Sequence, residues 1–297
     1  MNAPHAPFGT VLTAMATPFK SDGTLDLESA QRVARHLIDH GHDGIVVSGT
    51  TGESATTTKE QDGELLAAIK DEVKDDAVIV AGIGTNDTST STWLAQQAKK
   101  VGADGVLLVT PYYNKPGQRG ILTHFRHAVD AAELPVMLYD IPGRTGSQIA
   151  LESYLEMSSW EQVLAVKDAV GNYARGIRIA ELGFAIYSGD DIANLGWLAH
   201  GASGFVSVCG HVVGDRLRAM YDAFHHGDPR SALDIYTSML PAIDAIMGPD
   251  NYGATTAKAS LQLLGVLDNR RVRPPLVELD EAEVAVLRAG LDAAGVL

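Results

Sequence analysis

The chain has 297 residues, of which 45% are hydrophobic and 20% are charged, a composition typical of a globular protein that excludes a disordered or collagen-like one. Acidic residues outnumber basic ones by 37 to 23, and the formal net charge of −14 argues against partners such as nucleic acid or an anionic membrane. A single cysteine, no signal-peptide pattern at the start and no apolar run of about 18 residues predict a cytoplasmic protein that acts on small molecules.

Eight short apolar runs, rich in β-branched residues, recur along the first two thirds of the chain. Each run is nearly continuous rather than alternating, which is typical of strands buried on both faces of a parallel sheet. The runs span residues 11–17, 44–48, 78–83, 105–110, 135–141, 163–166, 184–188 and 204–208.

Segments with helical periodicity lie between these runs, and several end at a glycine that can supply a left-handed cap. They span residues 27–40, 59–72, 89–101, 121–132 and 173–181. After Gly210 the strand pattern stops, and only helical patterns follow, at 215–226, 229–246, 254–264 and 280–294.

Eight strands that alternate with helices predict an α/β fold of the (β/α)8 TIM-barrel type. A doubly wound sheet shares the alternation, but the count of eight favours the barrel. We expect residues 1–224 to form the barrel and residues 225–297 to form a C-terminal helical domain. In such barrels the chemistry occurs at the carboxyl ends of the strands, so polar residues at those ends are the candidate site.

Lys167 lies at the end of the sixth apolar run and should point its amine into the mouth of the barrel. Desolvation there favours the neutral amine, which attacks carbonyl carbons and forms Schiff bases. The alternative is a buried ion pair, with Asp168 or another carboxylate.

Other polar residues follow the fourth and fifth strands. Tyr139 could transfer protons through its phenol, or its hydroxyl could simply meet a backbone carbonyl. Arg144 could bind a substrate carboxylate, or pair with one of the many acids. Tyr112 and Tyr113 could cover a pocket, lie in a subunit interface, or pack on the surface.

The segment Gly49-Thr-Thr-Gly-Glu53 follows the second strand, and we expect it to open a helix. Backbone N–H groups and two hydroxyls at a helix start would suit a small carboxylate. An ordinary N-cap, with a threonine capping and Glu53 reaching back, is equally compatible with the spacing.

Signals for a metal or a cofactor are weak. The histidine pairs His36/His40 and His124/His127 lie on predicted helices without the intervening glutamate of a metalloprotease motif. The segment Gly82-Ile-Gly84 does not continue as a dinucleotide fingerprint. We therefore expect neither a metal nor a cofactor.

The whole chain resembles the dihydrodipicolinate synthase (4-hydroxy-tetrahydrodipicolinate synthase) family. These proteins are pyruvate-dependent class I aldolases related to N-acetylneuraminate lyase. Two motifs carry the resemblance: Gly-Ile-Val-Val-Ser-Gly-Thr-Thr-Gly-Glu-Ser at 44–54, and Tyr-Asp-Ile-Pro at 139–142 followed by Leu-Ala-Val-Lys-Asp-Ala at 164–169. The resemblance implies a TIM barrel and a homotetramer that is a dimer of dimers.

The resemblance also implies four catalytic residues. Lys167 matches the lysine that forms the Schiff base. Tyr139, Thr50 and Tyr113 match a proton relay, in which the tyrosine at the position of Tyr113 reaches into the neighbouring subunit's site.

Four further positions match substrate-binding residues of the family. Thr51 matches the residue that holds the carboxylate of pyruvate, and Arg144 the arginine that receives aspartate semialdehyde. Gly189 and Val206 match positions that line the pocket near the lysine.

The implied activity is that of a Schiff-base-forming lyase in lysine and diaminopimelate biosynthesis. It condenses pyruvate with L-aspartate 4-semialdehyde and requires no metal or cofactor. One alternative is another aldolase of the family, such as an N-acetylneuraminate or keto-deoxy-sugar lyase. A catalytically silent homologue is the other. The paired threonines, the paired tyrosines and Arg144 favour the synthase, because they suit a short aldehyde that carries a carboxylate.

Lysine, the end product of that pathway, inhibits some members of the family at their dimer interface. The positions that match its binding site and are kept here are Ser54, Ala55, Asn86 and Tyr112. Lys59 and Asp62 replace histidines, and Thr90 replaces the glutamate that would meet an ammonium group. We therefore expect weak or absent inhibition, with Asp62 as the acid that could compensate.

Overall fold

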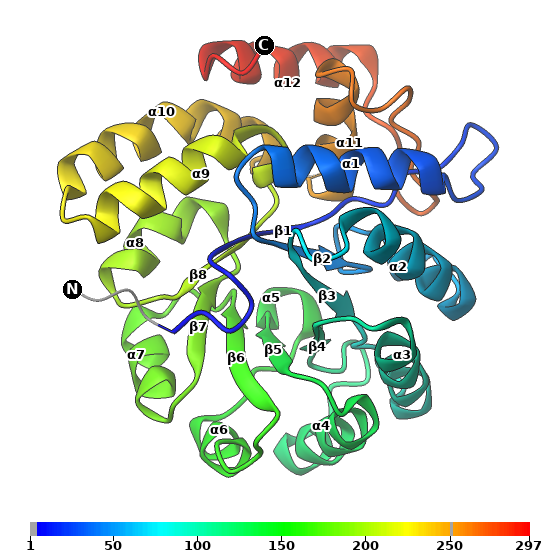
Figure 1. Cartoon of the computed structure of the whole chain (residues 1–297), viewed down its shortest axis with the longest axis vertical. Coiled ribbons are helices and arrows are strands. Elements are labelled where there is room, and N and C mark those ends of the chain that lie inside the picture. Colours follow the sequence, from blue (N-terminus) through cyan, green and yellow to red (C-terminus); the bar gives the residue numbers. More distant parts are fainter. Residues whose placement is uncertain (1–4, 250–251) are drawn as a thin grey trace.

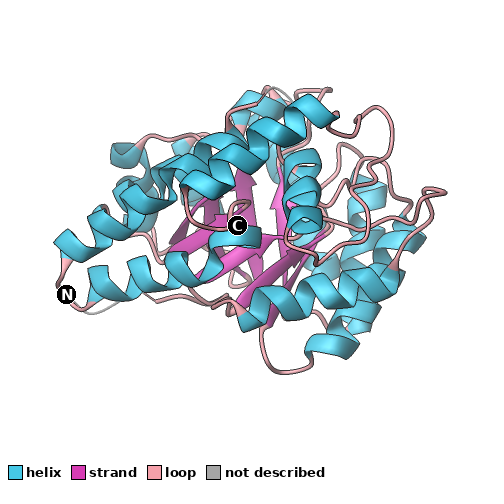
Figure 2. Ribbon diagram, turned by 90° about the horizontal axis from the view of Figure 1, so that it is seen from above, coloured by secondary structure: helices cyan, strands magenta, loops and turns pink. Residues whose placement is uncertain are grey.

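The computed structural model describes residues 5–249 and 252–297. Eight parallel strands form a closed barrel in chain order, and β8 pairs back onto β1. The strands lie inside a ring of helices, as Figures 1 and 2 show. The strands are β1 (Val11–Ala14), β2 (Gly44–Val47), β3 (Val78–Gly82), β4 (Gly105–Val109), β5 (Val136–Asp140), β6 (Val163–Asp168), β7 (Ala185–Ser188) and β8 (Gly204–Ser207). The predicted TIM barrel is therefore confirmed.

Helices follow the strands around the barrel, and the predicted ones agree with the structure to within a few residues at their ends. The barrel helices are α1 (Leu27–Asp39), α2 (Lys59–Val73), α3 (Thr88–Val101), α4 (Gln118–Ala132), α5 (Pro142–Thr145), α6 (Leu151–Met157), α7 (Tyr173–Glu181), α8 (Asn194–Ala199) and α9 (Gly210–His225). The sequence analysis did not anticipate α5, α6 and α8, nor the 3-10 turn η1 (Asp191–Ala193). These elements are too short for a periodic pattern to develop.

Local sequence explains where several helices begin and end. Asp26 and Asp87 cap α1 and α3 by accepting hydrogen bonds from backbone N–H groups of the first turn. Gly102 ends α3 with a φ of +84°, a left-handed conformation that glycine adopts without a steric cost.

Alternation along the strands separates two apolar layers. On β5, Met137 and Tyr139 join the cluster that fills the barrel, whereas Val136 and Leu138 join the cluster between barrel and helices. Because side chains alternate between the two faces of a strand, every second residue near a carboxyl end points into the barrel. Tyr139 and Lys167 both occupy such inward positions.

Three helices follow α9: α10 (Pro229–Met247), α11 (Ala254–Leu263) and α12 (Glu281–Ala293). Buried apolar side chains of all three helices form one cluster with those of α9, whereas Leu261 of α11 joins the cluster between barrel and helices. Figure 1 shows α10 alongside α9. The proposed division after residue 224 falls just before the end of α9 and stays a prediction, and residues 1–4 of the proposed barrel lie outside the described part. No helix in the described ranges is long and apolar enough to cross a membrane.

Candidate active site

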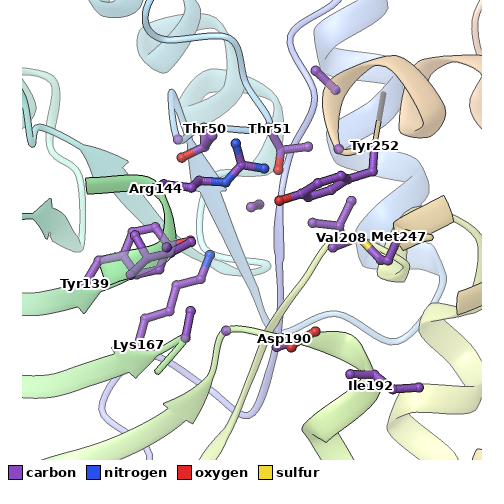
Figure 3. A pocket seen from close by; sticks show the side chains of 18 of the residues that line it. Thr50, Thr51, Tyr139, Arg144, Lys167, Asp190, Ile192, Val208, Met247 and Tyr252 are labelled. Atoms are coloured by element: carbon purple, nitrogen blue, oxygen red, sulfur yellow. The ribbon is translucent and has the colours of Figure 1, made fainter. Parts of the chain in front are cut away.

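A cavity of about 640 Å³ opens at the carboxyl ends of the strands. Loops after β2, β5 and β7 line it, together with the segment between α10 and α11. Figure 3 shows the Lys167 amine pointing into this cavity beside Tyr139, with Arg144 across from it. The structure therefore brings together Lys167, Tyr139, Thr50, Thr51 and Arg144, which the sequence analysis selected separately.

Lys167 is nearly inaccessible, with 5% of its surface exposed. In the described part of the chain its amine has no hydrogen bond and no carboxylate within ion-pair distance, because Asp168 faces away from the barrel and contacts Arg175. The alternative of an ion pair with Asp168 is therefore wrong. Burial lowers the pKa of Lys167 to about 8. About a tenth of the amine is then neutral at pH 7, against about one part in a thousand for a solvated lysine.

Tyr139 is the cross-strand neighbour of Lys167, since the register of β5 and β6 pairs these two residues. The amine nitrogen lies 4.3 Å from the centroid of the tyrosine ring. Burial raises the pKa of Tyr139, so the phenol keeps its proton at neutral pH. Within residues 5–249 and 252–297 its hydroxyl has no hydrogen-bond partner, so the alternative of a bond to a backbone carbonyl is wrong. The phenol is left to meet a ligand.

The segment that contains Thr50 and Thr51 differs from the expectation that it opens a helix. Residues 49–57 form turns, and the backbone φ of Glu53 is +57°, which no α-helix accepts. Helix α2 begins only after Thr58, whose hydroxyl accepts a hydrogen bond from the backbone of Gln61. Both the helix-start and the N-cap interpretations of this segment are therefore wrong.

Distant contacts, rather than a helix, hold this turn. The Glu53 carboxylate accepts hydrogen bonds from the Lys258 ammonium group of α11 and from the backbone N–H of Arg273, the latter at 2.9 Å. Thr50 and Thr51 line the cavity above this anchor. Neither threonine hydroxyl has a hydrogen-bond partner among the described residues, so both can bind a ligand.

Arg144 lies on α5, at the mouth of the cavity. Its guanidinium stacks on the ring of Tyr252, 4.8 Å from the centroid. No carboxylate in the described ranges pairs with it, so within those ranges the interpretation that Arg144 neutralises an acid finds no partner. Among the described residues the arginine thus offers its positive charge to a ligand.

Among known proteins, the sequence profile of the dihydrodipicolinate synthetase family matches residues 7–294 of this chain. The chain belongs to this family.

Individual members of the dihydrodipicolinate synthetase family are similar to this chain over nearly its whole length. The 4-hydroxy-tetrahydrodipicolinate synthase of Kineococcus radiotolerans is 50% identical over 293 residues, which are 98% of this chain and 95% of that protein. The 4-hydroxy-tetrahydrodipicolinate synthase 2 of Streptomyces coelicolor is 49% identical over 296 residues, 99% of this chain and 98% of that protein. The structure of the synthase from Cyanidioschyzon merolae with lysine bound has a TM-score of 0.94 at 38% identity and covers 99% of this chain and 100% of that chain.

The two other residues expected from the family pattern differ in their placement. Gly189 lines the cavity, and a β-carbon there would lie 3.1 Å from Cε of Lys167, so glycine leaves room for the lysine side chain. Val206 does not line the cavity. It is buried in the interior cluster that includes Tyr139, whereas Val208, beyond the end of β8, reaches the cavity.

The side chains of the adjacent residues Tyr112 and Tyr113 have different surroundings. Tyr112 lines a second cavity of about 240 Å³, which shares Thr50, Tyr139 and Arg144 with the first one. Tyr113 lines neither cavity; it is 89% exposed and its backbone φ is +72°. A bulky residue in this conformation is uncommon and marks a functional constraint more often than chance.

Sequence reasoning missed the contribution of the C-terminal helices. Met247 and Tyr252 line the cavity, although the helices after residue 225 were expected to be separate from the barrel. The sequence patterns also gave no role to Asp190. This residue lines the cavity, and burial raises the pKa of its carboxyl group. The Ser-Gly-Asp-Asp pattern at the end of the seventh strand was the signal that could have found it. Among the described residues no three or more His, Cys, Asp or Glu side chains form a group suited to a metal.

Proposed function

We propose that the chain is a 4-hydroxy-tetrahydrodipicolinate synthase, a lyase that condenses pyruvate with L-aspartate 4-semialdehyde through a Schiff base on Lys167. The observation that carries this proposal is the buried, unpaired amine of Lys167 with its lowered pKa, beside the Tyr139 ring. The names and coverage of the relatives support the same assignment.

In the first step the neutral amine of Lys167 attacks C2 of pyruvate. The resulting carbinolamine loses its hydroxyl as water, and a protonated imine remains. The phenol of Tyr139 supplies the proton that the departing hydroxyl needs. Thr50 and a Tyr113 hydroxyl from a neighbouring subunit complete the relay to solvent.

In the second step the protonated imine withdraws electrons and the methyl group of pyruvate loses a proton, which gives an enamine. The enamine carbon attacks the aldehyde carbon of the semialdehyde, and a carbon–carbon bond forms as the imine is restored. The C=O π electrons of the aldehyde move to its oxygen, which takes up a proton and becomes a hydroxyl. The amine of the semialdehyde then attacks C2, and Lys167 leaves as the free amine. The product is a ring, and the chain is regenerated.

Substrate recognition uses the remaining residues at the cavity. The hydroxyl of Thr51 binds the carboxylate of pyruvate, and Arg144 binds the carboxylate of the semialdehyde. Gly189 leaves space beside the lysine. Both substrates carry a carboxylate although the chain carries −14, but charges beyond about 8 Å are screened at physiological ionic strength, so the local cations dominate.

The partners of the active form are further copies of this chain, in a homotetramer that is a dimer of dimers in the cytosol. The exposure of Tyr113 supports this arrangement, since the tyrosine would be covered only when a second subunit contributes the site it enters. In each dimer of this tetramer, either subunit contributes its Tyr113 to the active site of the other.

Trapping of the imine tests the proposal. Incubation with pyruvate and borohydride should attach one reduced pyruvate per chain, on the peptide that contains Lys167. Lys167→Ala should abolish the label, and Lys115→Ala, which alters a lysine outside the cavity lining, should not. A label on another lysine, or turnover with N-acetylneuraminate but not with pyruvate and aspartate semialdehyde, would overturn the assignment.

A further inference from the structure

Each of the two residues proposed to do the chemistry is followed along its strand by an aspartate, and the two aspartates also pair across the strands. β5 and β6 pair Tyr139 with Lys167, and the next pair along the strands is Asp140 with Asp168. Because strand residues alternate between faces, the first pair points into the barrel and the second points toward the surrounding helices. Both carboxylates are fully buried at 0% exposure.

Arg175 contacts both of these carboxylates. Its Nη2 atom lies 2.8 Å from Oδ2 of Asp140, and its Nη1 atom lies 3.5 Å from Oδ2 of Asp168. The arginine belongs to α7, which covers the outside of the barrel beside β7 (Figure 1), and its side chain is only 12% exposed. One guanidinium group therefore bridges two neighbouring strands from behind the reacting pair.

The bridge is part of a larger buried network. Asp140 also accepts a hydrogen bond from the Tyr154 hydroxyl at 3.2 Å, and Arg175 donates to the backbone carbonyl of Ile149. Asp168 accepts hydrogen bonds through its other oxygen from the backbone N–H of Val170, at 2.8 Å, and of the next residue. In the described part of the chain, Arg175 is the only cation within ion-pair distance of either carboxylate.

Charge balance makes this arrangement sensitive to the arginine. Two buried carboxylates share one cation, and burial raises the pKa of Asp140 to about 6 even though Arg175 opposes the shift. Without Arg175, two buried carboxyl groups would face each other across adjacent strands with no cation between them, and the repulsion would be relieved by a shift of the strands, by protonation of a carboxyl group, or by both. Tyr139 and Lys167 lie one residue away on the same strands, so a shift of the strands would move both side chains.

We propose that Arg175 is a positioning residue, which fixes Tyr139 and Lys167 relative to each other by bridging Asp140 and Asp168 on the opposite face of the two strands. This inference rests on the proposed Schiff-base function of Lys167. It assigns a role in the reaction to a residue outside the cavity that touches neither substrate.

The experiment measures the rate of pyruvate trapping by borohydride as a function of pH, on folded protein. In Arg175→Met we expect the rate at neutral pH to fall by about 100-fold, the scale expected when a reacting group is misplaced by about 1 Å. The rise of the rate with pH should also move to higher pH, because a displaced and better solvated Lys167 regains a pKa closer to its ordinary value. Arg175→Lys keeps the charge but not the planar fork and should give an intermediate rate.

Arg178→Met is the matched control, since Arg178 is an exposed arginine on the same helix. It should leave both the rate and its pH dependence unchanged. A purely structural role of Arg175 would lower the thermal midpoint but leave the pH profile of the folded protein in place, and that result would overturn the inference. If Arg175→Met fails to fold, an unchanged pH profile in Arg175→Lys overturns it instead. An unmodified chain that traps no pyruvate would overturn the proposed function, and the role of Arg175 in that reaction with it.

Discussion

The amine nitrogen of Lys167 lies 4.3 Å from the centroid of the Tyr139 ring, across two neighbouring strands inside the barrel. The face of an aromatic ring attracts a cation only weakly, by about 0.5–2 kcal/mol, and it offers no hydrogen bond. Desolvation therefore dominates at this position, and it lowers the pKa of the amine rather than raising it as a carboxylate partner would.

A pH-dependent rate of imine formation follows from this relationship. The folded protein binds the lysine proton less tightly than a solvated lysine with a pKa of 10.5 does, so raising the pH through about 8 converts the amine to its reactive form. We expect the initial rate of pyruvate trapping by borohydride to rise about tenfold per pH unit below that value and to level off above about pH 9. A rate that keeps rising toward pH 10.5 would show that the amine is solvated and ordinary.

Removal of the Tyr139 hydroxyl should lower turnover without lowering thermal stability. In Tyr139→Phe the ring still packs in the barrel interior, so we expect an unchanged thermal midpoint. Turnover should fall about 100-fold or more, because proton transfer by a positioned group contributes about that much. Near-normal turnover would contradict the role of this phenol.

Tyr187→Phe is the contrasting control. Tyr187 neighbours Lys167 on its other side, but its hydroxyl accepts a hydrogen bond from the backbone of Phe8 and donates one to the carbonyl of Gly9. Loss of these buried bonds should cost about 1–3 kcal/mol of stability and leave turnover nearly intact. The two variants should therefore show opposite patterns in thermal melting and in activity.

The exposed tyrosine predicts that active sites are shared between subunits. Tyr113→Phe and Lys167→Ala should each be impaired alone. When the two variants are unfolded and refolded together, some mixed dimers contain one site with an intact Tyr113 and an intact Lys167. We expect activity to reappear in these mixtures, up to about a quarter of the sites if the subunits combine at random. Isolated mixed dimers without activity would contradict the sharing of sites.

Sequence patterns predicted the barrel and the central lysine because both depend on local features. A continuous apolar run marks a strand that is buried on both faces, and Lys167 interrupts such a run at its carboxyl end. Its lowered pKa follows from burial, so the lysine could be selected as a candidate before the fold was known, with a buried ion pair as the alternative.

Features that depend on distant contacts could not be predicted in this way. The turn at Glu53 has the spacing of a capping box, but Lys258 and the backbone of Arg273, both far along the chain, hold its carboxylate, and the residue adopts a left-handed conformation instead. Tyr252 at the cavity mouth was missed for the same reason, since nothing in a helical pattern indicates which barrel face the helices cover.

Removal of one partner of the ion pair between Glu53 and Lys258 should destabilise the chain strongly. Both side chains are only 1% exposed, and the ammonium group also donates to the carbonyl of Arg271 at 2.8 Å. Lys258→Met leaves the Glu53 carboxylate without its charged partner, so we expect a loss of about 3–5 kcal/mol in the free energy of unfolding. The double variant Glu53→Gln with Lys258→Met removes both charges and should recover part of that loss. Denaturant titrations measure both values, and a single variant as stable as the parent would contradict this role.

The second cavity bears on inhibition by lysine, because Ser54, Ala55 and Tyr112 line it. Among the described residues that line it, Arg144 is the only charged one, and its sign is wrong for an ammonium group. Asp62, the acid that could compensate, lies outside this lining, and its carboxylate already accepts hydrogen bonds from Ser48 at 2.9 Å and another hydroxyl at 2.7 Å. Asp62 is therefore not placed to pair with the ammonium group of a lysine in this cavity.

Lysine should therefore inhibit this chain weakly or not at all. Thr90 uses its hydroxyl and its backbone N–H on Asp87 and offers no negative charge. The Lys59 amine, which lies 4.8 Å from the centroid of the Trp93 ring, is a cation and supplies no partner for an ammonium group either. A charge buried without a partner costs several kcal/mol, and about 1.4 kcal/mol is already a factor of ten in affinity. Titration of lysine into an assay with pyruvate and aspartate semialdehyde measures the effect. Thr90→Glu, which supplies the acid that lysine-sensitive members of the family carry at this position, should gain sensitivity, whereas strong inhibition of the unmodified chain at submillimolar lysine would show that another group binds the ammonium.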